Sequence, residues 1–438
     1  MFKTLSLSIY IIIIFYFIFR KMLYGDYEKL IGPMTIFLIL LSPAFTIIPG
    51  RPAIRGEDSI IIFFCLTLLG KYSSNKYSIK YHSVPKVISF LMAIVFISTV
   101  INGFNNDDLL LRDFFFIFLL LKYMILFKIA ASTPLDENAV KRYIIAILSA
   151  GFLQSMIALC QYYNLLSINS WLTPYITGWE SRIDSLLHHW NIRRVLGTVG
   201  NPNSLGNIFV TISAIAISIT LNVKDKKYII VSLLFIILMA FSITLTLSRA
   251  SLISFVFVLV FASFIMIIKK NKLKNSFAFL LAVITILALS FKVGLGTLSD
   301  RFRQQDVMSY GSIVIRIIDL TEPFDMASDS IIKMTIGHGS VKALGNTYIH
   351  NDYGWYFHKY GFAGLAGYIV LLIVILHKAI NGYNVHAPWW QNFIITSVFL
   401  VTINWVVFAL SVVTISNMQL ASINIFFSGL LYAKRRNA

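Results

Sequence analysis

Residues 226–249 read KKYIIVSLLFIILMAFSITLTLSR, and this stretch decides the fold. Two lysines precede the apolar run 228–246, which holds no charged residue and has the length that crosses a bilayer as a helix. Lipid offers the backbone no hydrogen-bond partners, so a spanning segment has to satisfy its own N–H and C=O groups. The stretch therefore predicts a transmembrane helix with lysines at one end and Arg249 at the other.

Similar apolar runs recur along all 438 residues. Hydrophobic residues make up 58% of the chain and charged residues 13%, against about 25% charged in soluble proteins. This composition excludes a soluble domain and a disordered chain, and basic character alone does not indicate nucleic-acid binding. We expect an all-α, polytopic protein with 12–13 transmembrane helices in a single integral membrane domain over residues 1–438. The runs lie near 6–20, 30–48, 58–70, 86–102, 110–131, 143–164, 204–222, 228–246, 250–268, 276–295, 361–377, 390–410 and 413–432.

The net charge of +18 is unevenly distributed along the chain. Because Lys and Arg favour the cytoplasmic ends of membrane helices, the links where they collect indicate orientation. All of these links can be cytoplasmic if the helices alternate from residue 86 onward. The N-terminus stays open, since thirteen spans put it outside and twelve inside, and Arg51 and Arg55 fit poorly with an outside link. The basic links are 71–86, 224–227 and 269–274, and the tail is 434–436.

In this orientation, two long segments face outward, 165–203 and 296–350. Loops longer than about 12–15 residues are usually functional or disordered, and the Trp, Tyr, His and Arg content of these two argues against disorder. Arginines on the outer side favour an anionic ligand, although long loops can also cross the membrane regardless of charge. These arginines are Arg182, Arg193, Arg194, Arg301, Arg303 and Arg316. Aromatic residues that could stack on sugars or anchor the membrane interface are Trp171, Trp179, Trp190, Tyr348, Tyr353 and Trp355.

The segment 193–207 reads RRVLGTVGNPNSLGN. Asn201 followed by Pro202 is typical of a helix start, with Asn as the N-cap and Pro in the first turn. A helix N-terminus offers N–H groups and a partial positive charge to an anion. Since Arg193 and Arg194 lie just upstream, we expect an anion site here. The simpler alternative, the plain start of a membrane helix, is compatible with it.

Arg249 lies between two apolar runs with almost no loop, at the outer face of the predicted topology. An arginine in the membrane costs several kcal/mol unless it is paired, which makes it a functional candidate. The alternative is a side chain that extends to the lipid headgroups. The small neighbours Ser248, Ala250 and Ser251 leave room for a close approach, which favours function.

The second outer loop contains a helical pattern over residues 312–333. Apolar residues recur there at helical spacing, with charged residues between them. Arg316 lies in this pattern and, taken alone, is best explained as solvated or paired with Asp319 or Asp300. The apolar positions are Ile313, Ile317, Leu320 and Phe324.

His350 stands at the start of another predicted helix, before Asn351 and Asp352, which can cap it. A histidine at a helix start is often structural, but this one lies at the outer face among aromatic residues. Histidine is also the side chain best suited to exchange a proton near neutral pH. His358, two helical turns later on the same face, and His338 are weaker candidates.

Several common catalytic motifs are missing from the sequence: a P-loop, an Asp-x-Asp pair, a His-Glu-x-x-His motif and a nucleophile elbow. Hydrolysis of ATP, metal-dependent transfer from sugar nucleotides and serine hydrolysis therefore lack support. We expect no metal and no cofactor.

Three segments together resemble the O-antigen ligase/polymerase family: Arg194-x-x-Gly-Thr-x-x-Asn-Pro-Asn, Leu247-Ser-Arg-Ala, and His350-Asn-Asp-Tyr followed by Gly361-Phe-Ala-Gly-Leu. Each motif alone is weak, whereas their order, spacing and sidedness are more specific, and the hydrophobic layout is similar over nearly the whole chain. The resemblance implies a membrane glycosyltransferase of the GT-C fold type. It would act, without a metal, on undecaprenyl-pyrophosphate-linked oligosaccharides at the periplasmic face of the bacterial inner membrane.

The same resemblance implies roles for individual residues. Arg249 matches the family's arginine at a helix–helix turn, and Arg316 resembles its arginine in the outer-loop helix. His350 matches its histidine before the last helices and would be the catalytic base. Arg194, with its neighbours Arg193 and Asn203, lies in the segment typical of polymerases and would bind the pyrophosphate substrate.

Within the family we favour an O-antigen polymerase over an O-antigen ligase, because of the His-Asn-Asp-Tyr form, the Asn-Pro-Asn segment and the two large outer loops. One departure weakens this choice: Gly206 lies twelve residues after Arg194, where the polymerase pattern has ten between Arg and Gly. A flippase for the same lipids would place charges in mid-membrane near broken helices. The candidate charges here cluster at one face instead, although Arg112 and Lys292 lie near helix ends. A purely structural protein is the remaining alternative, and a chain-length regulator is a possible partner.

Overall fold

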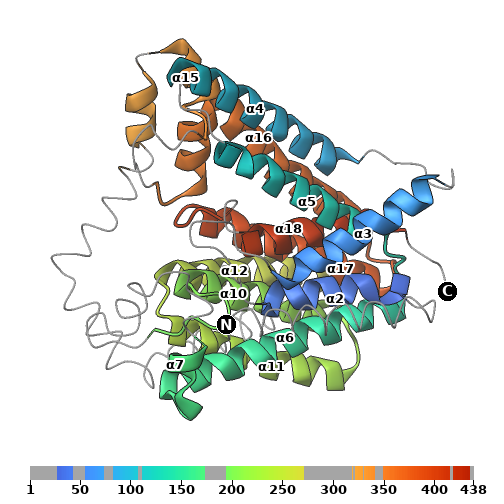
Figure 1. Cartoon of the computed structure of the whole chain (residues 1–438). Helices are drawn as coiled ribbons and strands as arrows, with labels where there is room; N and C mark the ends of the chain where they lie inside the picture. The colour runs from blue at the N-terminus through green and yellow to red at the C-terminus, as the bar shows by residue number, and fades with distance from the viewer. Residues whose placement is uncertain are drawn as a thin grey trace.

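The computed structural model describes residues 27–42, 55–73, 82–106, 111–172, 194–270, 318, 321–328, 330–340, 349–414 and 418–434, and this part of the chain contains helices and no strand (Figure 1). Eight of its helices are long and apolar enough to cross a membrane, which agrees with a multi-pass helical protein. The predicted runs 6–20 and 276–295 lie outside the described residues. The eight helices are α4 (Ser83–Asn106), α5 (Phe115–Ser132), α6 (Glu137–Tyr163), α10 (Pro202–Asn222), α11 (Lys226–Thr246), α12 (Arg249–Lys270), α16 (Asp352–Gly382) and α17 (Trp389–Ala409).

Shorter helices complete the described part. Two of them, α2 (Tyr27–Leu41) and α18 (Met418–Leu430), are apolar and lie against the bundle, and α3 (Gly56–Ser73) packs on α2 and α5. The small elements at the helix ends are α7 (Ile168–Trp171), α15 (Ile331–Ile336) and single 3-10 turns at Leu111–Phe114 and Leu165–Ser167.

Polar side chains fix where the long helices begin. The Asn201 side chain accepts hydrogen bonds from the N–H groups of Asn203 and Ser204, which confirms the predicted N-cap of α10. Asp136 caps α6 through Ala139 N–H, at 2.6 Å, since a carboxylate satisfies an N–H group that has no partner within the helix.

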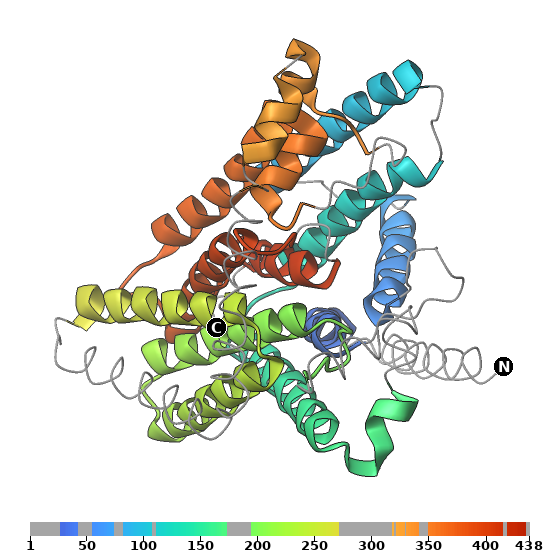
Figure 2. The same cartoon turned by 90° about the vertical axis from the view of Figure 1, so that its left-hand side faces the viewer.

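α10 and α17 form the centre of the bundle. In these two helices 94% and 83% of the apolar window is buried, whereas in the other six the share is 39–50%, so those six lie at the outside of the bundle. α17 packs against α10, α12, α16 and α18 (Figure 2).

One face of the bundle gathers lysine-rich links. Leu135, in the link after α5, donates its N–H to the carbonyl of Lys434 at 3.0 Å. The Ser83 hydroxyl at the start of α4 lies 2.6 Å from the Tyr432 hydroxyl after α18. The link 223–225, with Lys224, borders the same cavity as the link between α16 and α17. We call this side the lysine face; it lies to the right in Figure 1, near the C-terminus.

α2 ends inside the bundle, at Leu41, although the apolar run continues to 48. The last carbonyls of a helix lack partners within it, and in an apolar interior such groups need polar side chains. Four neighbouring elements supply these side chains, so the early end is stabilised by tertiary contacts that the run itself does not reveal. The donors are Gln419 to Ile39 (2.8 Å), Gln154 to Leu40 (2.8 Å), Thr198 to Leu41 (2.7 Å) and Arg55 to Ser42 (2.7 Å).

Candidate functional site

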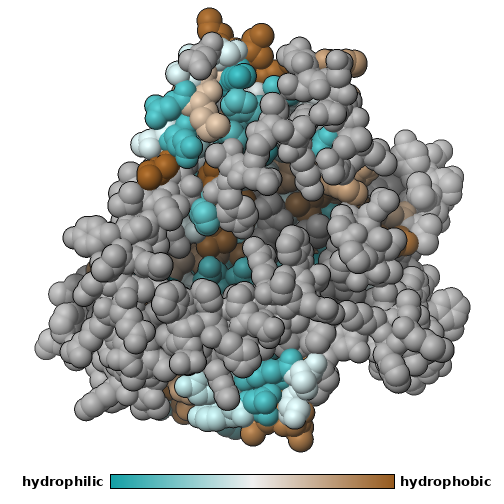
Figure 3. Space-filling view, turned by 60° about the vertical axis from the view of Figure 1, so that its left-hand side comes forward, coloured by the Kyte–Doolittle hydropathy of each residue, from teal (hydrophilic) through white to brown (hydrophobic). Residues whose placement is uncertain are grey.

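The starts of α10, α12 and α16 lie at one level, together with the end of α17. Asn404, five residues before the end of α17, bonds Asn207 at 3.2 Å and also Ser254, and these are five residues after the starts of α10 and α12. The Tyr353 hydroxyl, in the first turn of α16, donates to the Val406 carbonyl at 3.2 Å. We call this side, opposite the lysine face, the arginine face; Figure 3 is turned toward it.

Arg194 joins two of the motif segments. Its guanidinium donates to the Thr246 carbonyl at the end of α11, at 3.1 Å, and to the Asn203 side-chain oxygen, at 3.1 Å. Two of the predicted substrate-binding residues, Arg194 and Asn203, are therefore neighbours, and each serves partly to hold the other.

The anion site expected at the N-terminus of α10 is smaller than predicted. The N–H groups of Asn203 and Ser204 both donate to the Asn201 side chain, at 2.9 and 3.2 Å, so they are already engaged. The favourable charges that remain for an anion at this place are the Arg194 guanidinium and the helix dipole.

Two glutamines of α6, missed in the sequence, hold the segment that carries Arg194. Gln161 accepts from the N–H groups of Leu196 and Gly197, at 2.9 and 2.7 Å, and donates to the Gly197 carbonyl at 3.1 Å. Gln154 accepts from Thr198 N–H at 3.2 Å. Both glutamines are buried, and seven-residue spacing puts them on one face of α6. Polar residues seven apart in an apolar run were the signal that could have revealed them.

The link between α11 and α12 contains only Leu247 and Ser248, and α12 begins at Arg249, as the sequence predicted. Leu247 has φ of 52°, a left-handed conformation that turns the chain sharply. The half-buried Arg249 therefore lies at the arginine face, in the first turn of α12.

The small residues after Arg249 allow α10 to pack closely against the start of α12. Ser251 lies against α10, where its hydroxyl donates to the Asn203 carbonyl at 3.3 Å. A Cβ atom added to Gly206 would lie 2.4 Å from that hydroxyl oxygen. The close approach predicted here is thus helix packing, and it places Arg249 beside the Arg194 segment.

His350 lies half-buried one residue before the cap of α16. Asn351 is the cap, since its side-chain oxygen accepts from Gly354 N–H at 2.7 Å. Asp352, which the sequence also suggested as a cap, is instead fully buried and binds inward. Its carboxylate accepts from the Thr414 N–H at 2.8 Å, from the Thr414 hydroxyl, and from the Tyr368 hydroxyl at 2.8 Å. Asp352 therefore ties the start of α16 to the chain after α17.

The aromatic residues Tyr353 and Trp355, after His350, are half-buried and contact neighbouring helices. Trp355 lies against Phe116, with ring centroids 5.1 Å apart, and against Tyr360, at 5.6 Å. Tyr353 uses its hydroxyl on α17. The sugar-stacking role considered for Tyr353 and Trp355 stays a prediction. Of the other aromatic candidates, Trp179, Trp190 and Tyr348 lie outside the described residues.

His358 and His338 form a buried stacked pair, with ring centroids 4.8 Å apart. The chain before α16 runs against a break in that helix: His338 N–H donates to the His358 carbonyl at 3.0 Å, and Gly361 has φ of 61°. Burial, together with Lys333 and Lys359, lowers the pKa of His338. Since the rings are stacked together away from solvent, a structural role is the simplest explanation of the pair.

The long amphipathic helix predicted over 312–333 is wrong in its second half. The helix at 321–327 ends, and Ser330 caps a separate helix, α15, by accepting from Lys333 N–H at 3.4 Å. Phe324 stacks on Phe357 of α16, at 3.9 Å, so this piece is docked on the bundle. Arg193 and Arg316 lie outside the described residues, and their predicted roles stay predictions.

A charge cluster missed in the sequence lies at mid-depth in the bundle. Lys122, the eighth of 18 residues in α5, bonds Glu57 at 3.1 Å and Asp58 at 2.7 Å. Arg55 pairs with Glu57 at 3.0 Å. Arg55 is therefore compensated by an internal carboxylate, which removes it as evidence on the orientation of the N-terminal helices. Among the described residues, Glu57 Oε2 has no hydrogen-bond partner.

The chain matches no protein-family model and no curated protein.

Proposed function

We propose that this protein is a membrane glycosyltransferase that polymerises undecaprenyl-pyrophosphate-linked repeat units of O-antigen or a related surface polysaccharide. The observation that carries the proposal is that three distant motif segments, around Arg194, Arg249 and His350, lie at helix ends on one face of one bundle. Lysine-rich links gather on the opposite face, and the positive-inside rule makes that face cytoplasmic. The site would then face the periplasm of a bacterial inner membrane.

The chemistry matches these side chains. In the proposed reaction, a sugar hydroxyl of one lipid-linked unit attacks the anomeric carbon of another, and the lipid pyrophosphate leaves. His350 accepts the hydroxyl proton as general base. Arg249 and Arg194 bind the pyrophosphate and stabilise the charge that grows on it. Attack opposite the leaving group inverts the anomeric centre.

Gel analysis of the surface polysaccharide of a deletion strain, complemented with variants, tests this function. Loss of a polymerase leaves single repeat units on the surface, loss of a ligase leaves long polymer unattached to lipid A–core, and loss of a flippase leaves lipid-linked units on the inner side. We expect single units, restored to long chains by the wild type.

His350→Ala and Arg249→Lys, expressed at wild-type levels, should not restore long chains. Lysine keeps the charge at position 249 but lacks the planar fork that binds phosphate oxygens in pairs. His377→Ala is the matched control, because His377 is exposed on the far part of α16, near its end. Full polymer from either site variant would refute the role given to that residue.

The flippase alternative is favoured by one specific observation, the mid-depth cluster of Arg55, Glu57, Asp58 and Lys122 beside the interrupted end of α2. Buried charges near broken helices are typical of transporters. The two positive and two negative charges balance, however, which is equally typical of a structural ion network. We therefore rank transport below glycosyl transfer.

A further inference from the structure

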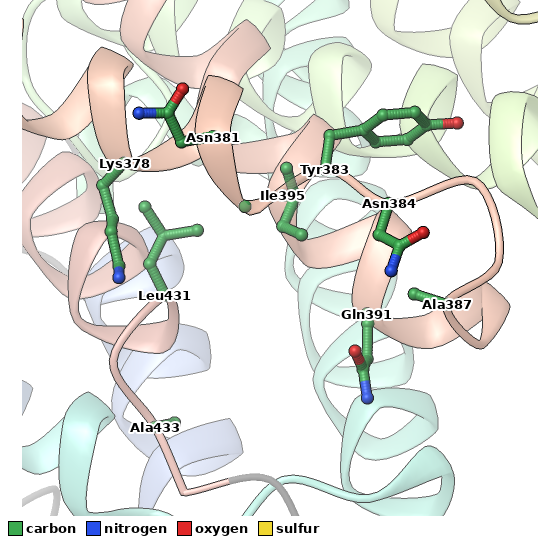
Figure 4. A pocket seen from close by; sticks show the side chains of 10 residues that line it. Lys378, Asn381, Tyr383, Asn384, Ala387, Gln391, Ile395, Leu431 and Ala433 are labelled. Carbon is green, nitrogen blue, oxygen red and sulfur yellow. The ribbon is translucent and has the colours of Figure 1, made fainter.

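A cavity of about 770 Å³ lies on the lysine face, where α16 ends, α17 begins and α18 ends (Figure 4). Its volume is in the range of pockets that hold small organic ligands. It is on the opposite face from Arg194, Arg249 and His350, so it is no part of the proposed glycosyltransferase site. The residues that line it are Lys378, Asn381, Gly382, Tyr383, Asn384, Ala387, Gln391, Ile395, Leu431 and Ala433.

The lining has a polar rim and an apolar floor. Lys378 and the amide side chains Asn381, Asn384 and Gln391 surround the apolar pair Ile395 and Leu431 (Figure 4). None of the lining residues is Asp or Glu. Such a lining favours a ligand with an anionic, hydrogen-bonding end and an apolar remainder.

Lys378 is exposed, and no described carboxylate forms an ion pair with it; its recorded contact is the Tyr432 ring, 5.3 Å from the ammonium. The Asn384 side-chain oxygen accepts from His386 N–H at 3.0 Å, which leaves its NH₂ group as a donor toward a ligand. A cation and an amide donor both bind phosphate oxygens, and the bond from the cation is the stronger one.

A neighbouring cavity of about 880 Å³ provides the contrast. Its lining includes Glu137 and Asp225 as well as Lys141 and Lys224, and Lys141 is already paired with Glu137 at 2.8 Å. The positive and negative charges of that cavity balance, so it does not favour an anion. Of the two cavities, the one lined by Lys378 is therefore the better site for an anionic ligand.

We propose that the cavity at Lys378 binds the headgroup of an anionic phospholipid, with Lys378 against the phosphate and the Asn384 amide on a hydroxyl group. Its position decides for a lipid over a free phosphate, because it lies at the ends of membrane helices, at headgroup level, and has an apolar floor. The lysine-rich links on the same face would concentrate anionic lipids around it.

The experiment uses the full-length protein, delipidated in detergent, with phosphatidylglycerol or phosphatidylcholine added, and counts bound lipid by native mass spectrometry. We expect phosphatidylglycerol to bind and Lys378→Gln to weaken it about tenfold, the loss of one charge-assisted bond. The matched control is Lys227→Gln, an exposed lysine of the same face that does not line the cavity, and it should bind as the wild type does.

Asn384→Asp, which places a carboxylate in the rim, should weaken binding as well. Equal binding of the two lipids, or equal loss in the Lys378 and Lys227 variants, would overturn the proposal. Inorganic phosphate should not displace the lipid; if it does so at equal concentration, the site is one for free phosphate and the lipid assignment is wrong. Polysaccharide synthesis does not enter these readouts, so they stand apart from the proposed reaction.

Discussion

Gln161 shows how much a single buried amide can hold. Its side chain makes three hydrogen bonds to the backbone at Leu196 and Gly197, in an interior where no water replaces them. Each lost bond of this kind costs about 1–3 kcal/mol when its partner stays buried. The Arg194 segment is therefore held in place as much by α6 as by its own sequence.

Gln161→Leu, which keeps the size but not the hydrogen bonds, should destabilise the protein by roughly 2–4 kcal/mol. The thermal unfolding midpoint in detergent, followed by the protection of residues 194–200 from hydrogen exchange, measures this. Tyr163→Leu is the control, since that side chain is 61% exposed at the end of the same helix, and it should change stability by less than about 0.5 kcal/mol. A similar loss of stability in both variants would mean that the hydrogen bonds of Gln161 contribute nothing.

At the residue scale, the sequence predicted what local chemistry determines. The N-cap at Asn201 and the tight turn before Arg249 depend on neighbours within three residues, and both are confirmed. Asp352, which was expected to cap α16, instead accepts hydrogen bonds from Thr414, 62 residues away. The partners of Lys122 lie 64 and 65 residues away. Such pairs cannot be read from local spacing, which is why the Asp352 cap was wrong and the mid-depth cluster was missed.

At the element scale, α16 is unusual because it is kinked at Gly361, a residue with positive φ, and resumes as a helix after it. The kink allows the chain at Thr335 to come within contact distance. A Cβ atom at position 361 would lie 2.4 Å from the Thr335 carbonyl carbon, and φ of 61° is unfavourable for any other residue.

Gly361→Ala should therefore separate α15 from α16 and destabilise the protein by about 1–3 kcal/mol. Gly382→Ala, at the end of the same helix, is the control, because the nearest atom would be 3.5 Å from the new Cβ. Thermal unfolding of both variants tests this, and equal midpoints would show that the glycine at position 361 does not contribute to stability.

The docking of α15 should also depend on pH. Burial lowers the pKa of His338 below its ordinary value of about 6.5, so the undocked segment binds a proton more readily than the docked one. The docked state is then fully stable above about pH 6.5 and loses stability as the pH falls below it. Hydrogen exchange of residues 331–339 at pH 7.5 and pH 5.5 should show faster exchange at the lower pH, and His338→Asn should reduce the difference.

At the scale of the whole molecule, the multi-pass helical character follows from composition, whereas the arrangement of helices does not. The apolar runs and basic links predicted which segments are helices and which ends lie together. That α10 and α17 are central depends on side-chain pairs such as Asn207 with Asn404, 197 residues apart. An apolar run gives no sign of which neighbour will cover it.

The two faces predict opposite labelling in cells. If the arginine face points outward, as proposed, Leu166→Cys should react with a membrane-impermeant maleimide added to cells after replacement of Cys65 and Cys160, because position 166 is 90% exposed. Val385→Cys on the lysine face, at a position 70% exposed, should react only after the membrane is opened. Labelling of both positions from the same side would contradict the arrangement of the bundle.

The burial of α10 and α17 also bears on how the protein is made. These two helices have the lowest mean hydropathy of the eight, 1.8 and 1.9, and α10 carries Asn207 toward a partner near the other end of the chain. During synthesis α10 enters the bilayer well before α17 exists, with its polar stripe still uncovered. Packing of the centre is thus a late step that waits for the last helices, and chains that stop before α17 leave the polar side chains of α10 uncovered in the membrane.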